Sequence, residues 1–144
     1  MRIELLPGVG AGPLRLGMTV RQIEQAAGSP RMRRRNTLGE TEYVYDAVSV
    51  VFGGDSQRVV EVAVTPPARP QYKGRDMLGE EDAWKEAVRD DGNPYEYQGF
   101  IVLLSLGMTL TGVHDDDPSQ KAVTVFAEGR WDGLRGRMRR FRPV

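Results

Sequence analysis

His114 is the only histidine of this 144-residue chain, and it is followed by Asp115, Asp116, Asp117 and a proline. An imidazole beside clustered carboxylates could hold a divalent cation. However, adjacent side chains cannot all point at one ion, and the alternating ligand spacing of a calcium-binding loop is missing. The same residues are good turn formers. The run therefore predicts a solvent-exposed turn, and we expect neither a metal nor a cofactor in this protein.

Covalent and acid-base catalysis have few candidate residues. The chain has no cysteine, and a serine nucleophile would need His114 as its base in a sequence that has no nucleophile elbow. Most acidic residues lie in charged runs, where solvation is the usual state, although a glycosidase-type pair of carboxylates remains an alternative. We therefore expect a protein that is not an enzyme. A small hydrolase with an unidentified carboxylate pair is the second alternative.

Pairs of aromatic residues are better candidates for binding. Alternate residues of a strand project from the same face of a sheet, and amphipathic aromatic side chains on an exposed sheet are good interface anchors. The competing interpretation is that these rings cover the core and leave their hydroxyls at its rim. We predict a site for an unidentified partner protein, formed by Tyr43, Tyr45, Tyr95, Tyr97 and Phe100.

Arginines gather in two runs, residues 31–35 and 135–142, and the second follows Trp131 and includes Phe141. Such a pattern could bind phosphates while the rings stack on bases, but arginine-rich segments are also commonly solvated or folded onto an acidic face. The formal net charge is zero, so no overall field draws the chain to nucleic acid or to an anionic membrane. Nucleic-acid association is the first alternative to protein binding. Its candidate residues are Arg33, Arg34, Arg35, Arg137, Arg139 and Arg140.

Two short amphipathic helices must position these residues. The first is predicted to begin after Thr19, a good N-cap whose capping box is completed by Gln22. A Leu-Gly step opens it at Leu16, and a second Leu-Gly step opens another helix at Leu78, 62 residues later. In both copies a glycine with a proline two residues on closes the helix. This recurrence indicates a duplication.

Stretches rich in β-branched and aromatic residues predict the strands. The predicted strands are 2–6, then 43–45, 48–52 and 59–64 in the first copy, and 100–104, 108–113 and 122–127 in the second. A proline-rich joint at 66–70 separates the copies and is expected to lie outside the ladders. We predict an α+β fold of two tandem helix-plus-antiparallel-strand repeats, about 1–65 and 71–129, that form one sheet with helices packed on one face. A basic tail, 130–144, follows.

Length and hydropathy set the remaining bounds. A chain of this size forms one domain by default, with a core that needs no metal or disulfide. No apolar run approaches the roughly 20 residues needed to span a bilayer, and the first residues lack the apolar segment of a secretory signal. We expect a cytoplasmic protein without a membrane partner, either a monomer or a weak homodimer.

The segment Pro13-Leu14-Arg15-Leu16-Gly17-Met18-Thr19, with Ile23 and Gly28-Ser29-Pro30, resembles a known helix opening. It is shared by the β-lactamase-inhibitor-protein-like fold and the small lipoproteins of outer-membrane-protein assembly. The tandem arrangement is similar to the inhibitor proteins, which duplicate a helix-plus-antiparallel-sheet unit. The chain has no cysteine and we expect no export signal, unlike those secreted proteins, and in this it resembles cytosolic actinobacterial proteins with the same opening. The resemblance implies a protein-binding fold of inhibitor or immunity type.

Overall fold

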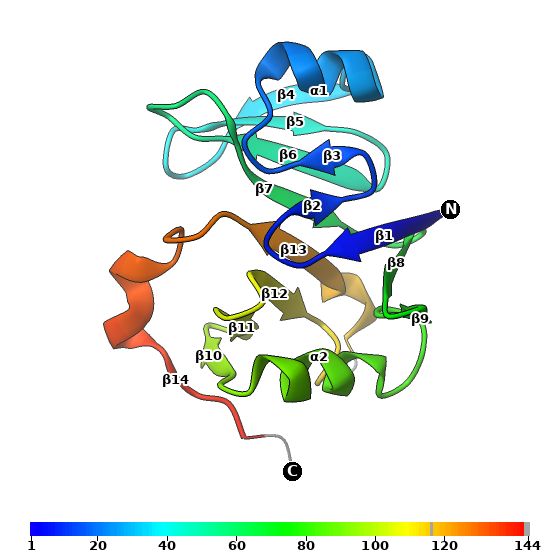
Figure 1. Ribbon diagram of the computed structural model, residues 1–144, viewed down its shortest axis with the longest axis vertical. Coiled ribbons are helices and arrows are strands. Elements are labelled where there is room, and N and C mark those ends of the chain that lie inside the picture. The colour runs from blue at the N-terminus through cyan, green and yellow to red at the C-terminus, as the bar shows by residue number, and fades with distance from the viewer. Residues whose placement is uncertain (116, 143–144) are drawn as a thin grey trace.

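The computed structural model describes residues 1–115 and 117–142, and the chain folds as an α+β protein built around two β-sheets (Figure 1). The predicted α+β class is confirmed, but the expectation of one sheet is wrong. None of the helices in these described ranges is long and apolar enough to cross a membrane. The helices are α1 (Val20–Ala27) and α2 (Ala83–Asp91), with two short 3-10 helices, η1 (Pro118–Gln120) and η2 (Asp132–Arg137).

The larger sheet has nine strands in the order β14-β10-β11-β12-β13-β7-β6-β5-β4, and every neighbouring pair is antiparallel. Strands from the first half of the chain occupy one end and strands from the second half the other, and the halves meet where β7 pairs with β13. The strands are β4 (Met32–Arg35), β5 (Thr41–Val44), β6 (Val48–Phe52), β7 (Val59–Val64), β10 (Tyr95–Tyr97), β11 (Phe100–Leu103), β12 (Met108–Thr111), β13 (Ala122–Phe126) and β14 (Arg139–Arg140).

The smaller sheet has five short strands, of which the sequence predicted only 2–6. Its order is β3-β2-β1-β8-β9, and β1 and β8 are parallel. Pro70 lies in β8, so the expectation that the joint 66–70 stays outside the ladders is wrong in part. The Arg69 N–H donates to the Met1 carbonyl, and the Pro70 carbonyl accepts a hydrogen bond from the Met77 N–H. Pro70 therefore occupies a position at which the ladder with β1 needs no N–H donor. The strands are β1 (Arg2–Leu6), β2 (Gly10–Ala11), β3 (Leu14–Arg15), β8 (Arg69–Tyr72) and β9 (Arg75–Asp76).

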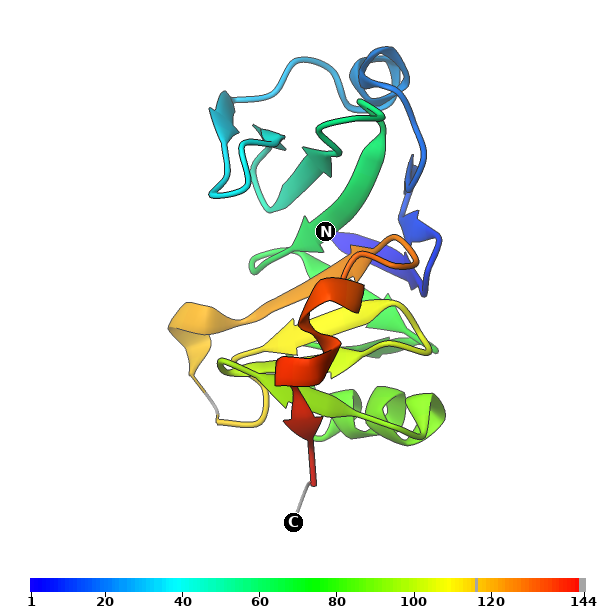
Figure 2. The ribbon, with the colours of Figure 1, turned by 90° about the vertical axis from the view of Figure 1, so that its left-hand side faces the viewer.

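The two helices and the smaller sheet lie on the same side of the nine-stranded sheet (Figures 1 and 2). One cluster of buried apolar residues fills the space between them. Alternate residues of the long strands supply its centre, among them Val50, Val62, Leu110 and Val125, which are 0% exposed. Helix α1 contributes Ile23 to the same cluster. The period of two along each strand thus decides which face of the sheet is packed.

The start of α1 is held by the capping box that the sequence predicts. The Gln22 N–H donates to Thr19 Oγ1 over 3.2 Å, and the Thr19 N–H donates to Gln22 Oε1 over 2.9 Å. We expect Thr19→Ala to lower the free energy of unfolding by about 1 kcal/mol, because the Gln22 N–H loses its acceptor and the Gln22 side chain loses the hydroxyl that helps to orient it. Urea denaturation of Thr19→Ala measures this loss. The control Thr19→Ser retains the hydroxyl, and an equal loss in both variants would contradict the capping role.

The tail that follows β13 is part of the fold. Figure 2 shows it running from the end of β13 past the neighbouring strands to β10, where β14 pairs with that strand. The Ala127 N–H donates to the Val60 carbonyl at its start, and the Phe141 N–H donates to the Pro94 carbonyl at its end, each over 2.9 Å. These two bonds fasten the described part of the tail to both halves of the chain. Residues 143 and 144 of the predicted tail lie outside the described residues.

Candidate binding face of the large sheet

A single row of side chains can be followed across all nine strands of the large sheet, because each ladder places one residue opposite the next. The row faces away from the helices, since on β5 to β7 and β11 to β13 the residues that alternate with it belong to the main core. We call this side of the sheet the open face. From β4 to β14 the row is Met32, Val44, Ser49, Ala63, Thr124, Thr109, Val102, Tyr95 and Arg140.

The part of the open face over β4 to β7 and β13 is accessible. Met32 is 47% exposed at the edge strand, and Val44, Ser49, Ala63 and Thr124 are half-buried. Three of these side chains are small, so the centre of the sheet presents a shallow surface with few projecting groups. Side chains of a partner can pack on such a surface, as the tail packs on the open face in the other half of the sheet.

In that other half, the tail lies on the open face. Val102, Thr109 and Phe126 point away from the helices, yet they are 0%, 3% and 2% exposed. The ring of Trp131 lies 6.0 Å from the ring of Phe100, measured between centroids, and slightly farther from those of Tyr97 and Phe126. Because aromatic pairs at such distances are attractive contacts, the indole anchors the tail to the sheet.

Arg130 fastens the start of the tail to the first half of the chain. Its two terminal nitrogens contact the two oxygens of Glu40 over 2.7 Å each, and Nη2 also lies 2.9 Å from Glu61 Oε2. The three side chains are only 17%, 11% and 22% exposed, respectively. A bidentate pair at this burial is stronger and more specific in direction than a surface ion pair.

The two carboxylates of this cluster respond differently to it. The hydrogen bonds from Arg130 hold the pKa of Glu40 below its usual value, and the Asn36 amide adds to the effect. For Glu61, burial outweighs the attraction of Arg130, so its pKa is raised. The paired carboxylates in turn raise the pKa of Arg130, Glu40 through its hydrogen bonds first. The cluster therefore holds one cation between two acids whose pKa values lie on opposite sides of the usual glutamate value.

Two of the predicted anchors lie on the packed side of the sheet. Tyr43 is 6% exposed, packs edge-on to Phe52 at 5.0 Å, and donates its hydroxyl to Glu24. Tyr45 follows the end of β5 and donates its hydroxyl to the Gly28 carbonyl over 2.9 Å. Both hydroxyls thus reach α1 or its end, so these rings cover the core with hydroxyls at its rim. Their prediction as exposed anchors is wrong because alternation puts Tyr43 beside Val50 of the core.

The other three predicted aromatics do lie on the open face, and the structure brings them together. Tyr97 and Phe100 are opposite each other on β10 and β11, and both contact Trp131. Phe100 is still 36% exposed. Tyr95 accepts a hydrogen bond from the Asn93 amide, which lowers its pKa, with smaller contributions from Arg135 and Arg140. These three side chains mainly form the surface on which the tail packs, and they border the accessible part of the open face.

The arginine runs form the two opposite edges of the sheet, β4 and β14, about 40 Å apart at roughly 4.8 Å per strand. They do not make one basic patch. Several of these side chains also have partners: Arg33 stacks on Tyr43 at 5.0 Å, and Arg34 pairs with Glu42 over 2.7 Å. The remaining partners are the Gly39 carbonyl for Arg35, Glu96 for Arg139 and Asn93 for Arg140. Arg137 is exposed on η2.

His114 is half-buried and is not part of a fully exposed turn. Its ring packs edge-on to Phe141 of the tail at 5.5 Å and to Trp84 of α2 at 6.5 Å. Asp116 of the same run lies outside the described residues. Among the residues that the structure describes, no group of three or more histidine, cysteine or acidic side chains could hold a metal ion.

The residues that sequence analysis missed are Trp131, Arg130 and the small residues at the centre of the open face. In the sequence Trp131 stands out only as a ring among arginines. The residues next to it in the sequence do not indicate which side chains it contacts in the fold. Ser49, Ala63 and Thr124 do carry a signal, because each occupies the polar or small position of an alternating strand. No protein-family model, curated protein or solved structure matches this chain.

Proposed function

We propose that this chain is a non-enzymatic protein-binding module of inhibitor or immunity type, which holds its partner on the open face over β4 to β7 and β13. The observation that carries the proposal is the use of this same face by the tail, where it buries an aromatic anchor. An interface core typically combines such an aromatic anchor with a well-packed, water-excluding surround.

The distribution of exposed apolar side chains supports this choice of face. Met32 and Phe100 are two of the few large apolar residues that are exposed, and both lie on the open face, at its two sides. Between them lie the small residues Ser49, Ala63 and Thr124. A partner segment laid across these strands would contact apolar groups at both ends without a projecting side chain in between.

We also propose that the two halves are tandem copies of one unit, as in the inhibitor-like fold that the sequence resembles. In support, each half places a helix before four antiparallel strands of the large sheet, and the final strands β7 and β13 pair at the centre. The smaller sheet is then an addition to the duplicated unit, made from segments that precede each helix.

The experiment that tests the binding face is affinity capture with the immobilised chain, from a lysate treated with nuclease and washed at high salt. We expect one protein to be retained by the wild type, and Ala63→Arg to reduce its retention at least about tenfold, because a long charged side chain would stand in the middle of the shallow surface. The matched control is Gln25→Arg, which adds the same side chain to the exposed surface of α1.

Two outcomes would contradict the proposal. If the bound material disappears with nuclease or salt, nucleic acid held by the arginine edges becomes the better explanation. If the retained protein binds Ala63→Arg as well as it binds the wild type, the interface lies elsewhere on the molecule. Both variants must first show cooperative unfolding close to that of the wild type.

A further inference from the structure

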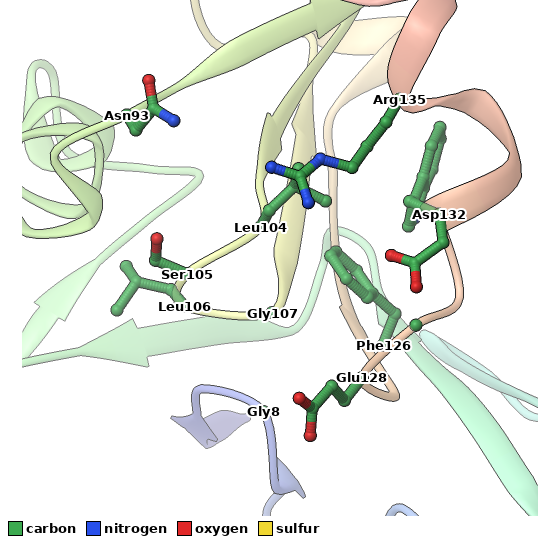
Figure 3. A pocket seen from close by; sticks show the side chains of 12 residues that line it. Gly8, Asn93, Leu104, Ser105, Leu106, Gly107, Phe126, Glu128, Asp132 and Arg135 are labelled. Carbon is green, nitrogen blue, oxygen red and sulfur yellow. The ribbon is translucent and has the colours of Figure 1, made fainter.

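A half-open cavity of about 580 Å³ lies beside the tail, at the turn between β11 and β12 and the end of β13 (Figure 3). Four chain segments enclose it: the loop at Gly8, Asn93 after α2, the turn 104–107 between β11 and β12, and the tail. Two of these meet closely, since a Cβ on Gly107 would lie 3.0 Å from the Cα of Gly8. The cavity is therefore bounded by segments that the fold holds in fixed contact, and its volume is typical of small-molecule sites.

Charged side chains of both signs line this cavity, and they do not neutralise one another. Arg135, Asp132 and Glu128 take part in none of the ion pairs found within residues 1–115 and 117–142. By contrast, Arg130 in the same tail is bound to two carboxylates. In Figure 3 the Arg135 guanidinium extends across one end of the cavity, the Glu128 carboxylate lies toward the other, and Asp132 lies between them.

The end of the cavity near Arg135 is suited to an anion. The Asn93 side chain lies at this end, and Arg140 donates a hydrogen bond to its amide oxygen. The neighbouring Tyr95 hydroxyl has a lowered pKa, first because Asn93 donates to it and then because of Arg135 and Arg140. Asn93 and Arg135 line the cavity itself, whereas Tyr95 and Arg140 lie behind Asn93 and hold its amide. The Arg135 guanidinium is therefore the group that a carboxylate would contact.

The other walls supply an apolar surface and two acids. Phe126 and Trp131 line the cavity beside the turn residues Leu104 and Leu106. A simple anion would meet the two carboxylates at the far end, and a simple cation would meet Arg135. A molecule with neighbouring carboxylate and ammonium groups can meet both Arg135 and Asp132, which lies between Arg135 and Glu128.

We propose that this cavity binds a small zwitterion of the free α-amino-acid class, with its carboxylate on Arg135, its ammonium group toward Asp132, and its side chain against Phe126 and Trp131. This binding site does not require the partner protein of the open-face interface, although Phe126 at the end of β13 borders both. The tail supplies most of the charged groups, so the ligand would also stabilise the tail against the sheet.

The test is a titration of the ¹⁵N-labelled chain with the twenty L-amino acids, first pooled and then singly. We expect at least one of them to shift the indole N–H signal of Trp131 and the amides of Gly107 and Gly129. The N-acetyl derivative of that amino acid lacks the ammonium group and its amide lacks the carboxylate, so each should bind at least about tenfold more weakly. Arg135→Gln should weaken binding by a similar factor, whereas Arg137→Gln, on the same helix but outside the cavity, should not.

The proposal would be overturned if no signal shifts at a 10-fold molar excess of ligand or at about 10 mM ligand. The second concentration lies above the Kd of a useful small-molecule site. A derivative without one of the charges binding as well as the free amino acid, or Arg135→Gln binding like the wild type, would also overturn it. Partner capture distinguishes the two proposals, because Ala63→Arg should leave amino-acid binding unchanged and Arg135→Gln should leave the retained protein unchanged.

Discussion

Replacement of Arg130 by methionine should lower the free energy of unfolding at pH 7 by about 2–3 kcal/mol. Methionine keeps much of the apolar volume but leaves Glu40 and Glu61 close together, 11% and 22% exposed, without their cation. The start of the tail also loses its attachment to the first half of the chain. Urea denaturation followed by tryptophan fluorescence measures the loss. The control is Arg137→Met, an exposed position of the same tail, where we expect a change within about 0.5 kcal/mol.

The loss caused by Arg130→Met should shrink as the pH falls from 7 to 4. In the wild type the pKa of Glu40 is lowered, so its stabilising contribution is present above the ordinary glutamate pKa and is lost as the pH falls through the folded value. In the variant both acids have raised pKa values, because burial and mutual repulsion favour protonation, and acid relieves that cost. Glu61 already has a raised pKa in the wild type, so it adds nothing to the acid-induced loss there. A pH-independent difference between the two proteins would contradict this account.

Replacement of Trp131 by alanine should cost about 2 kcal/mol and release the tail from the open face. The indole contacts the rings of Tyr97, Phe100 and Phe126, and no other side chain of the tail makes such a set of ring contacts in the described structure. Hydrogen exchange provides a local readout, because the Phe141 N–H is bonded to the Pro94 carbonyl at the far end of the tail. We expect its protection to fall more than that of core amides in β12.

Trp131→Phe separates ring packing from the indole N–H. The buried Nε1 has no hydrogen-bond partner within the described part of the chain, so its removal forfeits no bond. We therefore expect Trp131→Phe to lose less than about 1 kcal/mol and to keep Phe141 protected. If the phenylalanine variant lost as much stability as the alanine variant, ring packing would not explain how the tail is attached. A hydrogen bond from the indole N–H would then be required.

Much of the large sheet could be predicted because its strands alternate in polarity. The core strands near Val50, Val62 and Val125 were identified with small errors at their ends, and the capping box correctly placed α1. By contrast, β4 consists of exposed residues, mostly arginine, and has no apolar alternation, so the sequence predicted no strand there. The small sheet escaped prediction because its strands are short and its pairing joins residues far apart in the chain, as in the ladder of Ile3 with Pro70.

The candidate site was predictable only in part. Sequence analysis proposed an exposed sheet face and named Tyr95, Tyr97 and Phe100, which do lie there. It could not tell that Tyr43 and Tyr45 face the core, since an aromatic side chain suits either side of a strand. It also could not place the tail, because the contacts of Trp131 and Arg130 are set by the three-dimensional path of the chain and leave no periodic pattern.

The single ladder between β7 and β13 has a consequence for how the chain assembles. Its four residue pairs join positions 59 to 65 apart in the sequence, whereas the hairpins within each half join near neighbours. Loop-closure entropy makes such distant pairings form late, after the local hairpins. Until that ladder closes, each half presents an unpaired strand edge to its surroundings. In concentrated solution the corresponding half of a second chain can take that place, so exchange of halves between two chains competes with completion of the folded monomer.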